Sequence, residues 1–231
     1  MWTLDIDEAG NVADAPERDE VPLQIIDCEQ NSEQWSRERM GIPTASAFYK
    51  VISRGRADRP SETRRKYMLT LLGERLTGVL AESFDTPATD RGHHDEQFAA
   101  DDYAFRQNVT IETIGFMRRG NVGVSPDRCI VGVNGLVEIK SKKPDLQLAV
   151  LFDDVLPAEH KPQVQGALMV SGYDFVDFVS YCRDLPLFVK RIYRDEPYID
   201  WLRDQVDQFN RELDALERQM LDRYYGGAQA A

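Results

Sequence analysis

The chain has 231 residues, of which 42% are hydrophobic and 29% are charged, with 15 Gly and 11 Pro. This length and composition suit one compact domain and exclude collagen-like, low-complexity and wholly disordered proteins. No apolar run approaches the roughly 18 residues that a transmembrane helix needs, and the acidic start of the chain has no apolar stretch of signal-peptide length. We therefore expect a cytoplasmic protein with no membrane contact.

The net charge of −12 is unevenly distributed along the chain. Residues 1–32 carry nine acidic side chains and one basic one, whereas residues 33–75 carry ten basic and five acidic ones. A uniformly acidic protein would repel nucleic acid, but one basic segment on an acidic body can hold a polyanion and confine it to one surface. On charge alone, an ordinary solvated helix and loop is the better interpretation of this segment.

The composition also limits the metals that the protein could bind. Three widely separated cysteines without C-x-x-C spacing argue against a disulfide framework, a zinc ribbon and an iron–sulfur cluster, and we expect buried, reduced thiols. Only three histidines are present. A metal ion would therefore be held by carboxylates, which favour a hard cation such as Mg²⁺ or Mn²⁺.

The first part of the chain is predicted to be an acidic arm followed by helices. Residues 1–22 hold few apolar side chains and form the arm, and residues 23–225 form a single domain. Capping residues and apolar positions at helical spacing locate the helices. The first is a short helix that follows Asn31 or Ser32 and carries Trp35 and Arg39. A second helix over 45–51 is capped by Thr44, and two more are predicted over 62–76 and 92–103, the last with Phe98 facing the core.

The rest of the chain alternates apolar and polar residues and then returns to helical spacing. Strands are predicted over 109–114, 129–133, 136–140, 175–182 and 187–193, and helices over 160–170 and 197–220. Asn134-Gly135 predicts a two-residue hairpin turn between two of the strands. This order predicts a mixed α/β (α+β) domain with a central, mostly antiparallel sheet flanked by helices.

The predicted hairpin brings three reactive side chains to one face. Glu138 and Lys140 alternate with Val137 and Ile139 along a strand, and Asp127 shares their face when residues are counted back across the turn. Two carboxylates can hold divalent cations that polarise a phosphodiester, and a lysine can orient or deprotonate the attacking water. A solvated strand with an incidental Glu–Lys pair is the alternative, because this spacing alone is common.

Four blocks of the sequence, in order, resemble a known family. Asp127…Glu138-Ile139-Lys140 resembles the PD-(D/E)XK nuclease motif, and its surroundings resemble the lambda exonuclease family, also called YqaJ-like viral recombinases. The other blocks are Trp35-x-x-x-Arg39-x-Gly41-Ile42-x-x-x-Ser46, Gly92-His93-His94-Asp95-Glu96, and Gln163-Val164-Gln165 ahead of Gly172. The resemblance spans about residues 33–193. The sequence departs from the family's pattern at Arg128, because Gly is commoner after the catalytic Asp.

The resemblance implies a role for each matching position. Asp127 and Glu138, with the backbone carbonyl of Ile139, would bind Mg²⁺ or Mn²⁺; Lys140 would serve the attacking water, Glu96 would be an accessory acid and Gln163 a positioning group. Arg39, Ser46 and Ser125 would bind the 5′ phosphate of the strand being degraded, and the basic loop with Arg54, Arg56 and Arg59 would track DNA. Ser46, in the first turn of a predicted helix, suits an anion, whereas Trp35 is expected to be a core aromatic.

The function implied is a Mg²⁺-dependent 5′-to-3′ exonuclease. It would act on linear double-stranded DNA ends, release 5′ mononucleotides and leave 3′ single-stranded tails for recombination by strand annealing. The family alone implies a ring-shaped homotrimer and a single-strand annealing partner. Two alternatives stay open: a restriction or structure-specific endonuclease with the same catalytic residues but no need for the phosphate pocket, and a non-catalytic DNA-binding protein, which should have lost one of those residues.

Overall fold

The computed structural model describes residues 21–55, 61–81 and 87–224, except the side chains of residues 87–94. Most of the predicted arm therefore lies outside the described residues. The helices are α1 (Glu33–Arg39), η1 (Ala45–Ala47, 3-10), α2 (Phe48–Val51), α3 (Glu62–Thr77), α4 (Pro87–Gln107), α5 (Pro144–Asp153), η2 (Ala158–His160, 3-10), α6 (Lys161–Ser171) and α7 (Glu196–Tyr224). The strands are β1 (Leu23–Ile26), β2 (Ile111–Glu112), β3 (Phe116–Arg119), β4 (Val122–Val124), β5 (Arg128–Ile130), β6 (Gly135–Ser141), β7 (Phe175–Tyr181) and β8 (Phe188–Tyr193).

The central sheet has the strand order β2-β5-β6-β7-β8. Only β6 and β7 are parallel, and the other neighbours are antiparallel, so the predicted mixed domain with a mostly antiparallel sheet is confirmed. A second, three-stranded antiparallel sheet has the order β1-β3-β4. This second sheet was not predicted, because strands of three or four residues are too short to show a clear alternation. The helix α5 was not predicted either.

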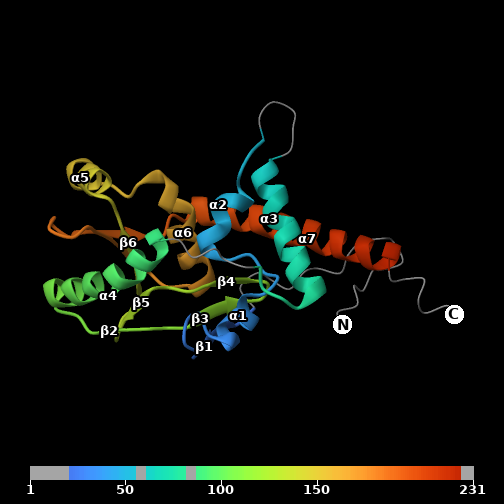
Figure 1. Ribbon diagram of the computed structural model, residues 1–231, viewed down its shortest axis with the longest axis horizontal. Helices are drawn as coiled ribbons and strands as arrows, with labels where there is room; N and C mark the ends of the chain where they lie inside the picture. Colours follow the sequence, from blue (N-terminus) through green and yellow to red (C-terminus); the bar gives the residue numbers. More distant parts are fainter. Residues whose placement is uncertain (1–20, 56–60, 82–86, 225–231) are drawn as a thin grey trace.

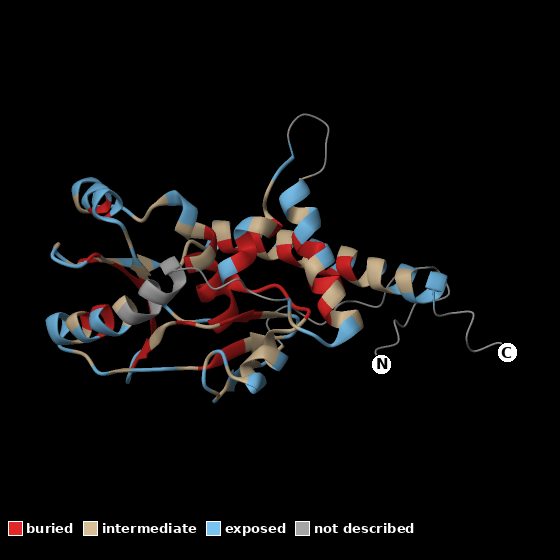
Figure 2. Ribbon diagram, viewed as in Figure 1, coloured by how far each residue is buried: buried red, intermediate tan, exposed pale blue. Residues whose placement is uncertain are grey.

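The two faces of the central sheet are covered by different helices (Figure 1). Leu136 of β6 packs in a large core together with residues of α3, α6 and α7. Val137 and Ile139 point to the opposite face and pack in a smaller core with α4. Figure 2 shows buried residues running through β6 and α6 and along the inner sides of α3 and α7. The alternation along β6 thus turns Glu138 and Lys140 toward α6.

The hairpin between β5 and β6 differs from the prediction. Ile130 pairs with Gly135 and Cys129 with Leu136, so the connection is the loop 131–134 rather than a two-residue turn. The positive φ of 82° in this loop belongs to Gly132. The register is shifted by an even number of residues from the predicted one, and an even shift keeps every side chain on its predicted face.

Gly135 lies in the strand because a neighbouring ring leaves no room for a side chain. A Cβ at this position would lie 2.4 Å from Cζ of Phe175 on the adjacent strand β7. The Asn-Gly pair therefore reflects close packing between strands and not the turn that it usually marks.

Other predictions were partly wrong. The helix over 45–51 is split into η1 and α2, and the strand over 109–114 is reduced to β2. Phe98 is 51% exposed, whereas Ala99, Ala100 and Tyr103 form the buried face of α4. The helices over 62–76, 160–170 and 197–220 and the strands over 175–182 and 187–193 are confirmed within a few residues. The three cysteines are free thiols, two of them buried.

Gly166 allows α6 to approach η1 and α2. A Cβ there would lie 2.4 Å from Cδ2 of the fully buried Phe48 and 3.4 Å from Cβ of Ala45.

We expect Gly166→Ala to lower the free energy of unfolding by about 1–3 kcal/mol, because overpacking forces a rigid core apart. Gly73→Ala is the matched control: nothing lies within 4 Å of its added Cβ, so it should raise the free energy of unfolding by about 0.5–1 kcal/mol. Urea unfolding measures both, and equal effects would contradict this packing.

Candidate active site

Glu138 and Lys140 of β6 meet the first turn of α6. The side chain of Glu138 is only 5% exposed, and its Oε1 forms an ion pair with the ammonium group of Lys140. The same oxygen accepts a hydrogen bond from Nε2 of Gln163 at 2.5 Å. Strand alternation and the position of the helix start therefore bring these three predicted site residues into direct contact.

Asp127 immediately precedes β5, whose pairing with β6 ends at Arg128 and Val137. Just beyond that pair, the main-chain N–H of Ile139 donates a hydrogen bond to Oδ2 of Asp127 at 2.6 Å. The N–H and C=O groups of one strand residue point to the same edge, so the carbonyl of Ile139 also faces the Asp127 side. The register places Asp127 opposite Glu138, at the open end of the strand pair.

The two carboxylates are close enough to affect each other. Burial raises the pKa of the Asp127 carboxyl well above its usual value, the charge of Glu138 raises it further, and the Lys140 ammonium opposes both. Burial alone would lower the pKa of Lys140, but the carboxylates of Glu138 and Asp127 outweigh it, and the pKa is raised. Two carboxylates thus share one ammonium group, and a further positive charge would stabilise the centre.

The donor atoms fit a hard divalent cation. In the described part of the chain, no group of three or more His, Cys, Asp or Glu side chains is placed to hold a metal ion. A site here would therefore use the carboxylates of Asp127 and Glu138 and the carbonyl oxygen of Ile139. Such all-oxygen donors suit Mg²⁺ or Mn²⁺. Burial and then the charge of Glu138 raise the pKa of Asp127, and a cation between the two carboxylates would relieve both effects.

Glu96 reaches the same end of the sheet from α4. Its Oε1 accepts a hydrogen bond from Nη1 of Arg128 at 2.9 Å, and its charge contributes to the raised pKa of Asp127. Arg128 also donates to Oε1 of Gln97 at 3.1 Å. The arginine that stands where the resemblance predicts Gly therefore ties α4 to β5 and holds Glu96 near Asp127.

Arg39 and Ser125 form a polar pocket next to this centre. Oγ of Ser125 accepts hydrogen bonds from Nη1 of Arg39 at 3.2 Å and from Nε1 of Trp35 at 2.8 Å. With two hydrogen bonds accepted, the hydroxyl proton of Ser125 remains to be donated. Burial lowers the pKa of the Arg39 guanidinium, and the nearby Tyr67 and Glu74 oppose this shift. A donating hydroxyl beside a half-buried guanidinium suits an anion such as phosphate.

The surroundings of Trp35 and Ser46 differ from those expected, while the phosphate-binding role of Ser46 stays a prediction. Trp35 is half-buried, and its ring lies under the guanidinium of Arg39 at 3.9 Å, so it supports the pocket rather than the core. Ser46 is exposed in the three-residue η1, with Oγ 3.4 Å from Oγ1 of Thr44. Thr44 makes no side-chain cap. The expected first turn of an α-helix is therefore absent at Ser46, and the structure links only Arg39 and Ser125 directly.

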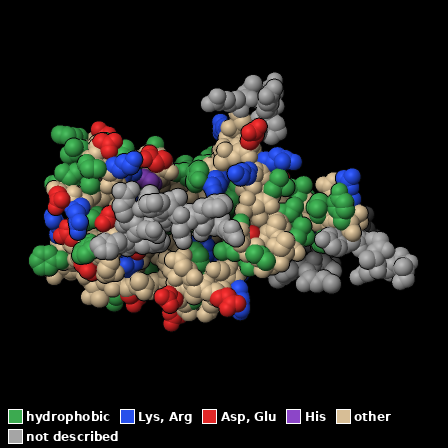
Figure 3. Space-filling view, in the orientation of Figure 1, with side chains coloured by type: hydrophobic (Ala, Val, Ile, Leu, Met, Phe, Trp, Pro, Cys, Tyr) green, Lys and Arg blue, Asp and Glu red, His purple; other side chains and the backbone are tan. Residues whose placement is uncertain are grey.

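The predicted DNA-tracking loop is described only in part. Arg54 is exposed, whereas Arg56 and Arg59 lie outside the described residues. Figure 3 shows Lys and Arg side chains gathered over α2 and the start of α3, where Arg65 and Lys66 are exposed as well. Part of the basic character of segment 33–75 thus lies on one surface.

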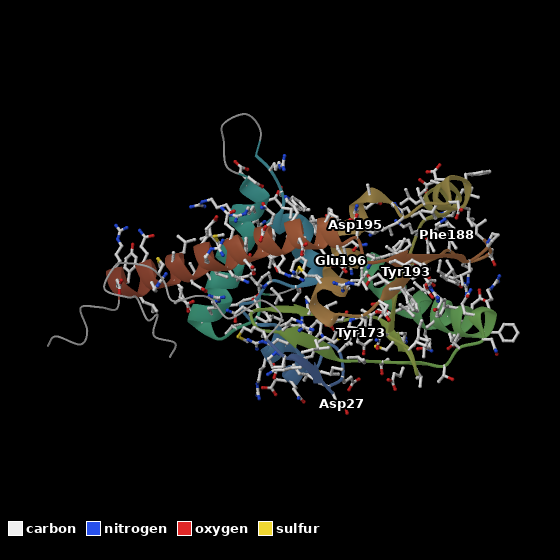
Figure 4. All side chains as sticks on the ribbon, turned by 180° about the vertical axis from the view of Figure 1, so that it is seen from behind. Asp27, Tyr173, Phe188, Tyr193, Asp195 and Glu196 are labelled. Atoms are coloured by element: carbon white, nitrogen blue, oxygen red, sulfur yellow. The ribbon has the colours of Figure 1, made fainter. Side chains whose placement is uncertain are left out.

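The two glutamines of the Gln163-Val164-Gln165 block have different tasks. Gln163 contacts Glu138, whereas the buried Gln165 donates to the carbonyl of Tyr193 and accepts from the N–H of Asp195, both at 3.0 Å. Figure 4 shows Tyr193 and Asp195 near each other at the turn from β8 into α7. Gln165 therefore fixes the orientation of α6, and with it the direction of Gln163.

A second polar pair joins Lys142, just after β6, to His160 at the end of η2, and the sequence did not predict this contact. Nζ of Lys142 lies 2.9 Å from Nε2 of His160, and the ring of His160 stacks on Phe178 with a centroid distance of 5.0 Å. Burial, followed by the charges of Lys142 and Lys140, lowers the pKa of His160 to about 4. No motif marks this pair, because its members lie on separate elements.

Comparison with known proteins identifies the family of this chain. Residues 34–174 match the model of the YqaJ-like viral recombinase domain. The chain belongs to this family. A direct comparison finds no matching curated protein. None of the helices in the described residues is long and apolar enough to cross a membrane.

The solved structures agree with the family. The alkaline exonuclease LHK-Exo from Laribacter hongkongensis is 27% identical, with a TM-score of 0.76 over 87% of this chain and 100% of that chain. Its crystal structure in complex with dAMP gives the same values. A phage-related exonuclease from Haemophilus somnus 129PT, 13% identical with a TM-score of 0.60 over 78% of this chain and 96% of that chain, shares the fold.

The neutral state of His160 can be tested by its titration. We expect the His160 imidazole to titrate near pH 4, measured by NMR and assigned with His160→Gln. The unfolded chain takes up this proton near pH 6.5 and the folded chain only near 4, so His160 destabilises the fold progressively as the pH falls from 6.5 to 4. A midpoint near 6.5 would show that the imidazole is not desolvated beside the lysines.

Proposed function

We propose that this protein is a metal-dependent 5′-to-3′ exonuclease that acts on the ends of linear double-stranded DNA. One observation carries the proposal: Ser125 of the anion pocket and Asp127 of the carboxylate centre are separated by a single residue, Pro126. In extended chain, two residues span about 6.6 Å, so a phosphate bound by Arg39 and Ser125 would lie beside the carboxylates. Family membership and the likeness to an alkaline exonuclease, one solved with the mononucleotide dAMP, support it.

The catalytic roles follow from the contacts at the centre. A bound Mg²⁺ would polarise the scissile phosphate and lower the pKa of a water molecule. Asp127, Glu138 and the carbonyl of Ile139 would hold that ion. Lys140, whose ammonium is positioned by Glu138, would orient the attacking water and stabilise the negative charge that develops on the phosphate. Gln163 would keep the Glu138 carboxylate in place through its hydrogen bond.

The anion pocket supplies the direction of digestion. A terminal phosphate carries more negative charge and more free oxygens than an internal diester, so Arg39 and Ser125 should prefer it. Holding the 5′ phosphate would position the next bond at the carboxylates, and each cleavage would create a new 5′ phosphate. In this proposal the products would be 5′ mononucleotides and a remaining 3′ single strand for annealing. A ring-shaped homotrimer and a single-strand annealing partner belong to the proposal through the family alone.

Removal of the centre's charged groups should separate binding from chemistry. We expect Asp127→Ala or Glu138→Ala to abolish cleavage while DNA binding and folding persist, because a metal ligand is lost and the core is kept. Lys140→Ala should lower the rate by about 10²–10⁴-fold, the usual effect of removing an acid–base or electrostatic group. The test compares the rate of DNA digestion, measured on gels with Mg²⁺, with the affinity for DNA, measured without Mg²⁺. Near wild-type turnover by any of the three variants would remove that residue from the mechanism.

The anion pocket should confer a preference for phosphorylated ends. We expect duplexes with a 5′ phosphate to be digested faster than those with a 5′ hydroxyl by about tenfold or more, the value of one charge-assisted contact. Arg39→Ala should shrink this preference more than it lowers the rate on 5′-hydroxyl ends. Arg37→Ala is the matched control, because Arg37 lies on the same helix but is exposed and paired with Glu33. Equal rates on both ends, or ready cutting of closed circular duplex, would favour the endonuclease alternative.

A further inference from the structure

The row of reactive side chains on β6 continues for two residues past Lys140. The N–H of Lys142 donates to the carbonyl of Tyr181 at 2.8 Å, so the chain still follows β7 at this point. Alternation then places Lys142 on the same face as Glu138 and Lys140. Two strand residues cover about 6.6 Å, so the two lysines form a short positive row that begins at the carboxylate centre.

The surroundings of Lys142 leave its charge poorly compensated. Its side chain is only 10% exposed, and the carboxylate of Glu159 lies 3.7 Å away on a side chain that is 67% exposed. Its closer polar partner, at 2.9 Å, is the uncharged imidazole of His160. Buried cations are normally paired with an anion. Lys140, by contrast, already has its partner in Glu138.

His160 holds the ammonium of Lys142 in one direction. As the acceptor, Nε2 of the neutral ring carries no proton, and Phe178 supports the ring from β7. This contact uses one of the three N–H groups of the ammonium, which leaves two for a ligand. His160 ends η2 and directly precedes α6, three residues before Gln163, so one short segment orients side chains at both ends of the row.

We propose that Lys142 binds a non-bridging oxygen of a phosphodiester in the strand that is cut, next to the scissile bond, and that His160 is its positioning residue. The inference deepens the proposed function and rests on it. A polyanion whose phosphates repeat along a strand matches a row of positive charge that starts at the site of cleavage. The phosphate would provide a closer anion than Glu159, whose exposed carboxylate lies 3.7 Å from the ammonium.

The test is DNA binding without divalent metal, so that cleavage does not enter the readout. We expect Lys142→Gln to weaken binding of a linear duplex by about tenfold or more at low salt. It should also reduce the slope of log Kd against log salt by about 0.9, the value for one phosphate contact. Lys143→Gln is the matched control, because it removes the same charge from the exposed neighbouring residue and should leave the slope unchanged. Equal slopes for wild type and Lys142→Gln, or equal losses for both variants, would overturn the proposal.

The role of His160 requires a double-mutant cycle. His160→Leu should weaken binding in the wild-type background and have no further effect in Lys142→Gln, because it acts only through the lysine. His160→Gln, which keeps an acceptor, should restore most of the affinity. An equal loss in both backgrounds would indicate a merely structural role. If thermal unfolding shows that His160→Leu does not fold, His160→Asn takes its place in the same cycle.

These outcomes are distinguishable from failure of the proposed function. A wild-type protein that cuts closed circles would refute the exonuclease, yet a reduced salt slope for Lys142→Gln alone would still identify a phosphate contact. Conversely, an end-directed exonuclease whose slope is unaffected by Lys142→Gln would retain the proposed function and lose this contact.

Discussion

The hydrogen bond from the main chain of Ile139 to Asp127 is the contact on which the site depends. It forms because the pairing of β5 with β6 ends at Arg128 and Val137, which leaves the N–H of Ile139, two residues further along β6, directed at the first side chain before β5. Asp127 is thereby held opposite Glu138. The carboxylate pair, the fit to a divalent cation and the position of Lys140 all follow from that register.

Elements distant in the sequence converge on this strand end. The helix α6 supplies Gln163 to the carboxylate of Glu138, and Gln165 locks the same helix to the turn before α7. From the other face, Arg128 draws Glu96 of α4 toward the centre. The anion pocket is attached to the same segment, because Ser125 lies two residues before Asp127. In the proposed function, binding of a chain end and cleavage of the next bond would therefore be coupled through a single intervening residue, Pro126.

Much of this arrangement is predictable from the sequence, for identifiable reasons. Long apolar stripes with terminal glycines mark α3 and α6, and short runs rich in Phe, Val, Ile and Tyr mark β7 and β8. The shared face of Asp127 and Glu138 survives an incorrect hairpin turn because the register error is an even number of residues. The predicted turn was wrong because Gly135 is required where the ring of Phe175 packs against the strand. Local sequence does not reveal this contact between strands. The contact between Lys142 and His160 was not predicted for the same reason.

The central claim is that the carboxylate centre cuts one nucleotide at a time from a phosphorylated 5′ end. The most direct measurement is digestion of a linear 5′-phosphorylated duplex with distinct labels at the 5′ and 3′ ends of one strand, in the presence of Mg²⁺, with early products separated by length. The account predicts that the 5′ label appears first and only as mononucleotide, while the 3′ label stays in long fragments. Early release of labelled oligonucleotides, or of the 3′ label first, would contradict it.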